Sequence, residues 1–370
     1  MTNRDKYKRT FDVLVSAAPV SLRDDHMKSK KHISGLRIAS AAVAAVLVVA
    51  ALGYGAFAAI HHYWGRGMNA GLQATDAQQQ ELTDSGMAVV YPEDEDYSSM
   101  AVTHEGVTVA PDTVIVDERA AYITFTISGL ALEDGEEPAY GEVYIYQGDD
   151  PNADDASLNM SGKMYDGIVC NEEGQAVYED GSPLEVTDDG NVVCHYTDEN
   201  GNLAFIIQAF PVYSTDTLLG KTVHIGFNDL GTVYKAEFTK EIDASWTFDI
   251  TLPDVSSSVD FEVEQPIEGT SFTLDSISIS PISLRAVYSV RGASEIHEDD
   301  LGIPEVQGVI LKDGTRLPYL TDGGSEGYTD ETQSAAAFTA GFDRVIDVDQ
   351  VAALLVRIPG SDVAEISLGQ

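Results

Sequence analysis

Cysteine and basic residues are scarce in this sequence of 370 residues, which holds two Cys and 21 Lys and Arg against 61 Asp and Glu. The formal net charge of −40 repels nucleic acid, so we expect no nucleic-acid partner. No CxxC pair or histidine cluster accompanies Cys170 and Cys194. This absence argues against a cysteine-based zinc site.

Catalytic motifs are absent too. The sequence contains no G-x-S-x-G elbow, no H-E-x-x-H helix, and no phosphate-loop or dinucleotide fingerprint. Its histidines after residue 100 are scattered over predicted strands and turns, at His104, His195, His224 and His297. A catalytic triad can assemble from distant segments, so an exported enzyme stays an alternative. The lack of these motifs favours a protein that is not an enzyme and needs no cofactor.

Three acidic runs resemble calcium loops, because oxygen-bearing side chains alternate in them: residues 149–155, 188–191 and 198–202. None of the runs completes the calcium-loop spacing that ends in a bidentate Glu. We interpret them as solvated turns and expect no bound metal.

Charge is distributed unevenly around one long apolar run, residues 38–60, which contains no charged residue. Residues 1–37 hold nine Lys and Arg against four Asp, whereas the chain after the run holds 12 basic and 57 acidic residues. As a helix the run would extend roughly 35 Å, enough to cross a membrane core of about 30 Å. The basic residues before it predict a cytoplasmic N-terminus and an acidic part outside the cell membrane. A cleaved signal peptide is the alternative, because Ala56-Phe57-Ala58 resembles a cleavage site.

The basic head predicts a short amphipathic helix over residues 6–20. Four of its apolar side chains fall at helical spacing before Pro19 ends the pattern: Tyr7, Phe11, Leu14 and Val15. An isolated helix of this length is marginal in water, so the stripe needs a binding partner. A groove on a protein and the surface of the membrane lipid fit it equally well.

Residues 74–85 predict a polar stalk helix, which Gly86 would end. From about residue 100 the sequence changes to short alternating runs separated by Gly, Asp and Asn turns, a pattern typical of β-sandwiches. We predict a turn at residues 117–119, a hairpin turn at Asp313-Gly314 and a short helix at 347–353. We predict strands at residues 107–109, 113–116, 121–127, 142–146, 203–209, 222–227, 245–252, 259–264, 271–279, 284–290, 306–311 and 354–358.

The predicted fold is mainly β, with a single transmembrane helix followed by two immunoglobulin-like β-sandwich domains. Its predicted parts are a cytoplasmic head (1–37), the transmembrane helix (38–60), a linker and stalk (61–98) and two extracytoplasmic β-sandwich domains (99–253 and 258–370).

The two cysteines fall in the part predicted to lie outside the membrane, where a disulfide can persist. Cys170 and Cys194 flank turn-rich sequence, so a bridge between strands is one interpretation and two buried free thiols are the other. A bridge that closes a loop of this size would stabilise the fold by roughly 3–4 kcal/mol.

Several short motifs succeed one another along the chain: Lys8-Arg9-Thr10-Phe11-Asp12, His104-Glu105-Gly106-Val107-Thr108-Val109, Val116-Asp117, Tyr122-Ile123-Thr124-Phe125, Leu219-Gly220-Lys221-Thr222-Val223, Trp246-Thr247-Phe248, Ile277-Ser278-Ile279-Ser280-Pro281-Ile282-Ser283-Leu284 and Lys312-Asp313-Gly314-Thr315. In this order they resemble the bacterial single-pass membrane proteins of the domain of unknown function 4179 family. Those proteins are often described as negative effectors of extracytoplasmic-function sigma factors. The resemblance covers most of the chain.

The resemblance implies a membrane-bound regulator whose cytoplasmic helix holds a sigma factor, while the outer β domains sense a signal or bind a wall component. One departure is the zinc motif of many anti-sigma factors, because this head contains His26 and His32 but no Cys. We therefore expect the apolar stripe of the head to make the contact. The alternative is an extracytoplasmic binding or adhesion module, anchored by one helix, whose head has no regulatory role.

Overall fold

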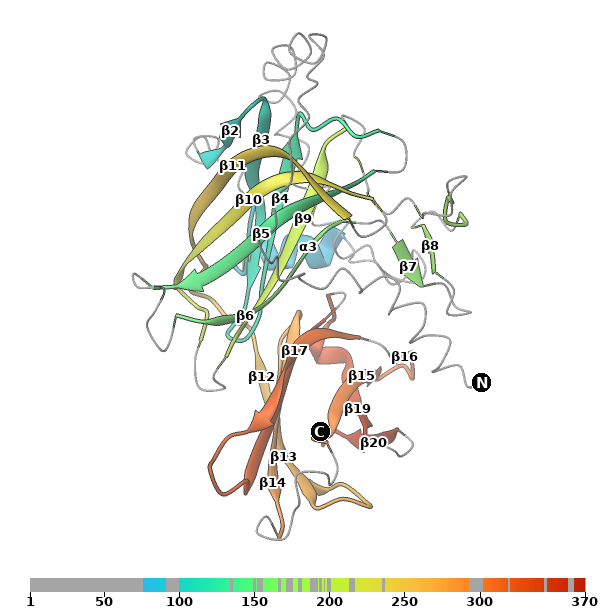
Figure 1. The fold of residues 1–370 in the computed structure, drawn as a ribbon. Helices are drawn as coiled ribbons and strands as arrows, with labels where there is room; N and C mark the ends of the chain where they lie inside the picture. Colours follow the sequence, from blue (N-terminus) through green and yellow to red (C-terminus); the bar gives the residue numbers. More distant parts are fainter. Residues whose placement is uncertain are drawn as a thin grey trace.

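The computed structural model describes residues 76–90 and 100–369, except 134–135, 149–150, 152–155, 166–167, 171–175, 179–181, 187–191, 193–194, 196, 198–200, 213–216, 235–236, 293–301, 319, 343–344 and 359–362. This part of the chain is mainly β and forms several antiparallel sheets (Figure 1). The prediction of a mainly β fold is therefore confirmed.

Two sheets form the N-terminal β unit. The larger sheet has the order β1-β3-β4-β9-β6, with β2 paired to β3, and the smaller has the order β11-β10-β5. The strands of the larger sheet are β1 (Ala88–Val90), β2 (Val102–His104), β3 (Val107–Val116), β4 (Ala121–Ser128), β6 (Leu158–Met164) and β9 (Leu203–Pro211). Those of the smaller are β5 (Glu137–Gln147), β10 (Thr222–Tyr234) and β11 (Glu237–Thr251).

The core of the N-terminal β unit lies between these two sheets, because alternate residues of both sheets bury their side chains in one cluster. Phe125 of β4 packs edge-on against Phe227 of β10, with ring centroids 4.8 Å apart. Trp246 of β11 is fully buried in the same cluster. The opposite face of β5, β10 and β11 is left on the outside of the molecule.

The C-terminal β unit also has two sheets, with the orders β12-β13-β14-β18-β17 and β16-β15-β19-β20. The first consists of β12 (Val259–Pro266), β13 (Phe272–Ile279), β14 (Ser283–Val290), β17 (Thr321–Tyr328) and β18 (Ala335–Phe342). The second consists of β15 (Glu305–Leu311), β16 (Arg316–Leu317), β19 (Val351–Arg357) and β20 (Ala364–Ser367). Side chains of both sheets share one buried cluster. A separate hairpin, β7 (Ile168–Cys170) and β8 (Ala176–Tyr178), belongs to the N-terminal half of the chain.

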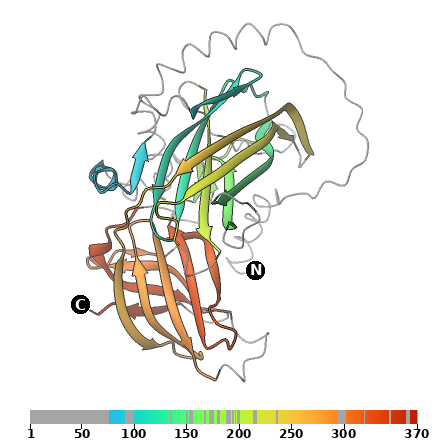
Figure 2. The same ribbon diagram turned by 90° about the vertical axis from the view of Figure 1, so that its left-hand side faces the viewer.

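The helix predicted at residues 74–85 is confirmed as α3 (Asp76–Asp84). Gly86 follows it with a φ of 79°, a left-handed conformation that glycine adopts without steric cost. In Figure 2 the two β units are arranged one above the other, and α3 lies at the side of the upper, N-terminal β unit.

Within the described residues, no helix is both long and apolar enough to span a membrane. The predicted transmembrane segment 38–60 and the head lie outside the described residues. Their structure is therefore not tested.

Several predicted boundaries are wrong. The strands predicted at 107–109 and 113–116 are one strand, β3, because a bulge between Pro111 and Thr113 lets the chain continue its pairing with β4. The helix predicted at 347–353 is a 3₁₀ turn of three residues, Val348–Gln350, and Val351 already begins β19. Pairing of β19 with both β15 and β20 outweighs the helical propensity of its alanines and leucines.

Strands β17 and β18 are among the strands that the prediction missed. Their sequences are rich in Gly and Ala, which have low β propensity. Yet β18 is a central strand, between β14 and β17. Its small residues suit that place, since an added Cβ on Gly341 would lie 2.0 Å from Tyr122 Oη of the N-terminal β unit.

Candidate functional site

The histidines considered as catalytic candidates contact different partners. His104 packs edge-on against Trp246 with ring centroids 5.6 Å apart, and His195 Nδ1 lies 3.2 Å from Glu137 Oε2. His297 is outside the described residues. No group of three or more His, Cys, Asp or Glu that could hold a metal ion occurs among the residues that the structure describes.

Other predicted site residues are not placed. The partner-binding residues Tyr7, Phe11, Leu14 and Val15 lie outside the described residues, and so does Cys194. Cys170 ends β7, but its side chain is outside the described part. The head contact and the disulfide therefore stay predictions.

The outward face of the β5–β10–β11 sheet gathers the strongest candidates for a binding site. The pairing register places Tyr146 of β5, His224 of β10 and Asp249 of β11 in one row across the sheet. His224 Nδ1 lies 2.6 Å from Asp249 Oδ1, and its ring stacks on Tyr146 with centroids 4.8 Å apart and planes at 24°. The row therefore holds the imidazole between an aromatic ring and a carboxylate.

The next row contains Tyr144, Gly226 and Thr247. The Tyr144 ring lies over Gly226, where an added Cβ would come within 2.1 Å of Tyr144 Cζ. Tyr144 and Tyr146 are nearly parallel, with centroids 6.3 Å apart and planes at 17°. Tyr144 remains 37% exposed. Because Gly226 has no side chain, the Tyr144 ring can lie flat against the outer surface of the sheet.

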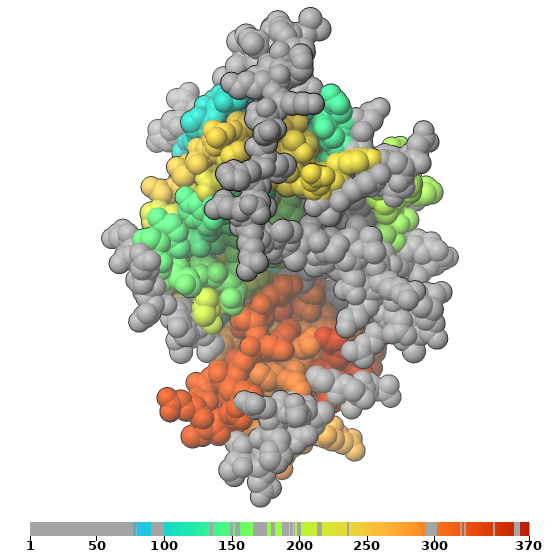
Figure 3. Space-filling model, in the orientation of Figure 1, coloured from blue at the N-terminus to red at the C-terminus, as the bar shows by residue number. Residues whose placement is uncertain are grey.

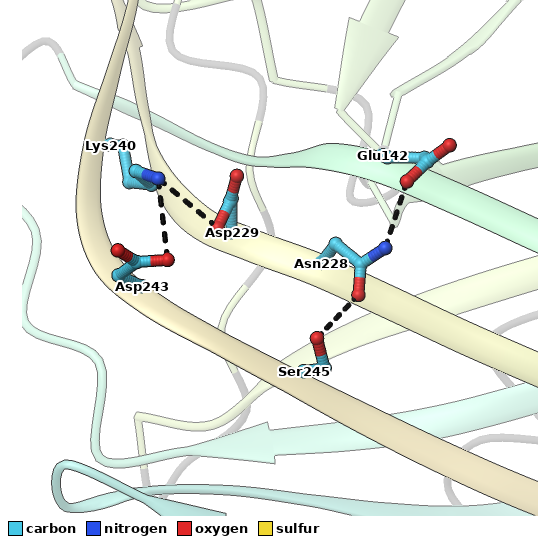
Figure 4. Close-up of polar contacts among 6 residues, drawn as sticks. All are labelled: Glu142, Asn228, Asp229, Lys240, Asp243 and Ser245. Atoms are coloured by element: carbon cyan, nitrogen blue, oxygen red, sulfur yellow. Dashed lines mark hydrogen bonds and ion pairs between the residues drawn. The ribbon is translucent and has the colours of Figure 1, made fainter.

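A polar row follows, formed by Glu142, Asn228 and Ser245 (Figure 4). Ser245 Oγ donates a hydrogen bond to Asn228 Oδ1 at 2.6 Å, and Asn228 Nδ2 donates one to Glu142 Oε2 at 2.8 Å. These bonds hold the amide in one orientation.

Beside this row, β10 bulges at Asp229, whose φ is 57°. Lys240 Nζ lies 3.4 Å from Asp229 Oδ1 and 3.4 Å from Asp243 Oδ1 (Figure 4). One ammonium group thus faces two carboxylates at the end of the polar row.

We call the set of outward residues in these three rows the tyrosine–histidine face: Glu142, Tyr144, Tyr146, His224, Asn228, Ser245, Thr247 and Asp249. In Figure 3, some side chains of β5 (green) and of β10 and β11 (yellow) are visible on the front of the upper part of the molecule. Rings and hydrogen-bonding groups held in fixed positions are suited to recognising a ligand.

A second feature is the contact between the two β units, which we call the inter-unit seam. Its apolar part is one buried cluster that joins α3 and residues of both units: Leu82, Met87, Ala88, Ile115, Ala120, Tyr122, Tyr165, Ile206, Phe210, Ile282 and Val345. Ser257 Oγ, in the segment that links the units, lies 2.9 Å from Met87 Sδ. The helix that precedes the sheets is thus packed where the two β units meet.

The polar part of the seam is organised by Asp117, which is completely buried. Its Oδ1 accepts the backbone N–H groups of Arg119 and Ala120, both at 2.7 Å. Its Oδ2 accepts the hydroxyls of Ser280 and Ser283 from the other unit. These four hydrogen bonds satisfy the carboxylate.

Sequence reasoning found part of both features. The strand predicted at residues 142–146 is confirmed as part of β5 (Glu137–Gln147). The turn predicted at residues 117–119 is confirmed, since β3 ends at Val116 and β4 begins at Ala121. The link from Asp117 to Ser280 was missed, because no local pattern signals a contact between residues 163 apart.

Comparisons with known proteins give no family. No family model matches this chain, and no curated protein matches it. A solved structure, that of a conserved domain protein from Bacillus anthracis, is similar over 71% of this chain and 78% of that chain, with 15% sequence identity and a TM-score of 0.42. At these values the similarity carries no argument, and the resemblance to the domain of unknown function 4179 family stays a prediction.

Proposed function

We propose that this protein is a membrane-anchored regulator that resembles an anti-sigma factor. In this proposal residues 38–60 cross the cell membrane, and the two β units are immunoglobulin-like domains that form an extracytoplasmic sensing region. The cytoplasmic head holds a sigma factor through Tyr7, Phe11, Leu14 and Val15. The proposal is for a binding protein and not for an enzyme.

The observation that supports this proposal is the position of α3. The helix begins at Asp76, with fifteen residues between it and the predicted span, and Leu82 near its end is buried in the inter-unit seam. A ligand that changes the contact between the β units would therefore act on the segment next to the membrane. A module that served only for adhesion would not need a helix next to the membrane to contact both β units.

An extracytoplasmic binding or adhesion module without a regulatory head is the second candidate. The tyrosine–histidine face favours it, because ligand binding at that face requires nothing from the cytoplasmic side. The two candidates differ in one respect, namely whether the head has a protein partner.

Co-purification of the full chain from native membranes distinguishes them, with bound proteins identified by mass spectrometry. We expect a sigma factor with the intact chain and its loss in the Phe11→Asp/Leu14→Asp variant, since charged side chains would disrupt docking of an apolar stripe. Lys6→Gln, a change outside that stripe, is the matched control and should retain the partner. If the intact chain holds no cytoplasmic protein, the regulatory proposal is rejected and the binding module remains.

A further inference from the structure

We propose that the tyrosine–histidine face binds a glycan built of amino sugars that carry free amino groups. This inference rests on the proposed function, in that it gives the outer β region a ligand. It combines three properties of the face: an exposed aromatic ring that lies flat over a glycine, an excess of carboxylates, and side chains held in orientation by hydrogen bonds.

The first property is the position of Tyr144. Its ring lies over Gly226 and remains partly exposed, so it offers an apolar surface that is already in place before any ligand binds. The C–H groups on one side of a sugar ring form a flat apolar patch. Moving this patch from water onto an aromatic ring is favourable in free energy. The nearly parallel ring of Tyr146 continues the surface along β5.

The second property is charge. Glu142, Asp249, Asp229 and Asp243 contribute four carboxylates on or beside the face, whereas Lys240 contributes one ammonium group. Asp249 has 76% of its side chain exposed. An ammonium group on the ligand would pair with these carboxylates and with the electron-rich faces of the tyrosines. An anionic glycan would be repelled, also by the 57 acidic residues of the chain after residue 60.

The third property is the arrangement of hydrogen-bonding groups around the rings. Among the described residues, the hydrogen bond between His224 and Asp249 uses one carboxylate oxygen, and that between Asn228 and Glu142 uses one as well. The second oxygen of each carboxylate can accept from a ligand. Thr247 lies in the same row as Tyr144, between the two carboxylate-bearing rows. Successive rows are separated by about 7 Å along a strand, so the three rows extend over roughly 14 Å. This length suits a short run of sugar rings more than a single small ion.

The test uses the full chain in detergent micelles at low salt, and isothermal titration with three probes. The probes are a glucosamine hexamer, an N-acetylglucosamine hexamer with the same rings but no charge, and a lysine hexapeptide with the charge but no rings. We expect the glucosamine hexamer to bind at least tenfold more tightly than either control. Equal binding of the N-acetylated hexamer would overturn the requirement for amino groups, and equal binding of the peptide would overturn the role of sugar stacking.

Variants locate the binding on the face. Tyr144→Ala and Asp249→Asn should each weaken binding of the glucosamine hexamer by about tenfold, as expected for loss of one cation–ring or ion-pair contact of about 1.4 kcal/mol. Tyr234→Ala removes a tyrosine of similar exposure at the far end of β10, and Asp260→Asn removes an exposed carboxylate on β12. Both should bind as the unmodified chain does. Unchanged thermal unfolding of the four variants would show that the fold is intact.

Failure of this proposal is separable from failure of the proposed function. If no probe binds, or if Tyr144→Ala and Asp249→Asn bind as tightly as the controls, the amino-sugar ligand is rejected. The sigma-factor co-purification does not depend on either result, because the head variants leave the face unchanged.

Discussion

Asp117 Oδ2 accepts a hydrogen bond from Ser283 Oγ at 2.5 Å, although the two residues are 166 positions apart in the sequence. Both side chains are buried, so the bond is shielded from water. Ser280 completes the arrangement: its hydroxyl donates to the same carboxylate and accepts the backbone N–H groups of Ile282 and Ser283. The turn after β3 and the turn before β14 are thereby joined through one carboxylate.

Replacing Asp117 should weaken the inter-unit seam. Asp117→Ala leaves two hydroxyls and two backbone N–H groups without their acceptor, and we expect a loss of about 3 kcal/mol or more in the free energy of unfolding. Urea denaturation followed by Trp fluorescence measures it. Asp260→Ala, an exposed Asp on β12, is the control and should change stability little. Equal stability of the two variants would contradict the role assigned to Asp117.

Gly341 and Tyr122 form a second contact across the seam, which a double-mutant cycle can test. An added Cβ on Gly341 would overlap Tyr122 Oη, so Gly341→Ala should destabilise the protein by about 1–3 kcal/mol. Tyr122→Phe alone should cost about 1 kcal/mol, because its hydroxyl donates to the Phe342 carbonyl at 3.0 Å. The double variant should be more stable than the sum of the single effects predicts, since Tyr122→Phe removes the clashing oxygen. Additive effects would show that the clash does not determine the cost.

Asp112 should make stability depend on pH. Burial raises the pKa of this carboxyl to about 7, despite a hydrogen bond from Thr124 Oγ1 at 3.2 Å. In the unfolded chain its pKa is about 3.9, so between these values the folded state binds the proton more tightly. This group therefore contributes stability at low pH that is lost as the pH rises from about 4 to about 7.

Asp112→Asn removes this titration. We expect the variant to gain stability relative to the unmodified chain as the pH rises, by up to about 4 kcal/mol above pH 7. Urea denaturation of both chains between pH 4 and pH 8 provides the comparison. A difference that stays constant over this range would contradict a raised pKa at Asp112.

Gly226 should be necessary for the position of the Tyr144 ring against the sheet. Gly226→Ala places a methyl group where the Tyr144 ring lies, so the ring must move away from the sheet. We expect a loss of about 1 kcal/mol in stability and weaker binding of the glucosamine hexamer. Adding Tyr144→Ala should restore the stability but not the binding. Unchanged binding in Gly226→Ala would show that the position of the ring does not matter.

Local sequence patterns were sufficient where one strand or turn carries the signal. The strand predicted at residues 142–146 lies within β5, because that run is rich in β-branched and aromatic residues. Gly86 and Asp117 were assigned correctly to a helix end and a turn. Prediction failed for β18, where Ala and Gly have little strand propensity and pairing with β14 and β17 decides the conformation.

The sequence by itself determined the charge asymmetry, the mainly β character and most strand positions, since each depends on composition or on a period of two residues. Tertiary structure alone decided that His224 lies between Tyr146 and Asp249, because the pairing register of three strands sets that row. It also decided that Asp117 meets Ser280 and Ser283, and that Leu82 of α3 packs in the same seam. Contacts between segments so far apart depend on how two folded units pack, and no local pattern in the chain encodes that packing.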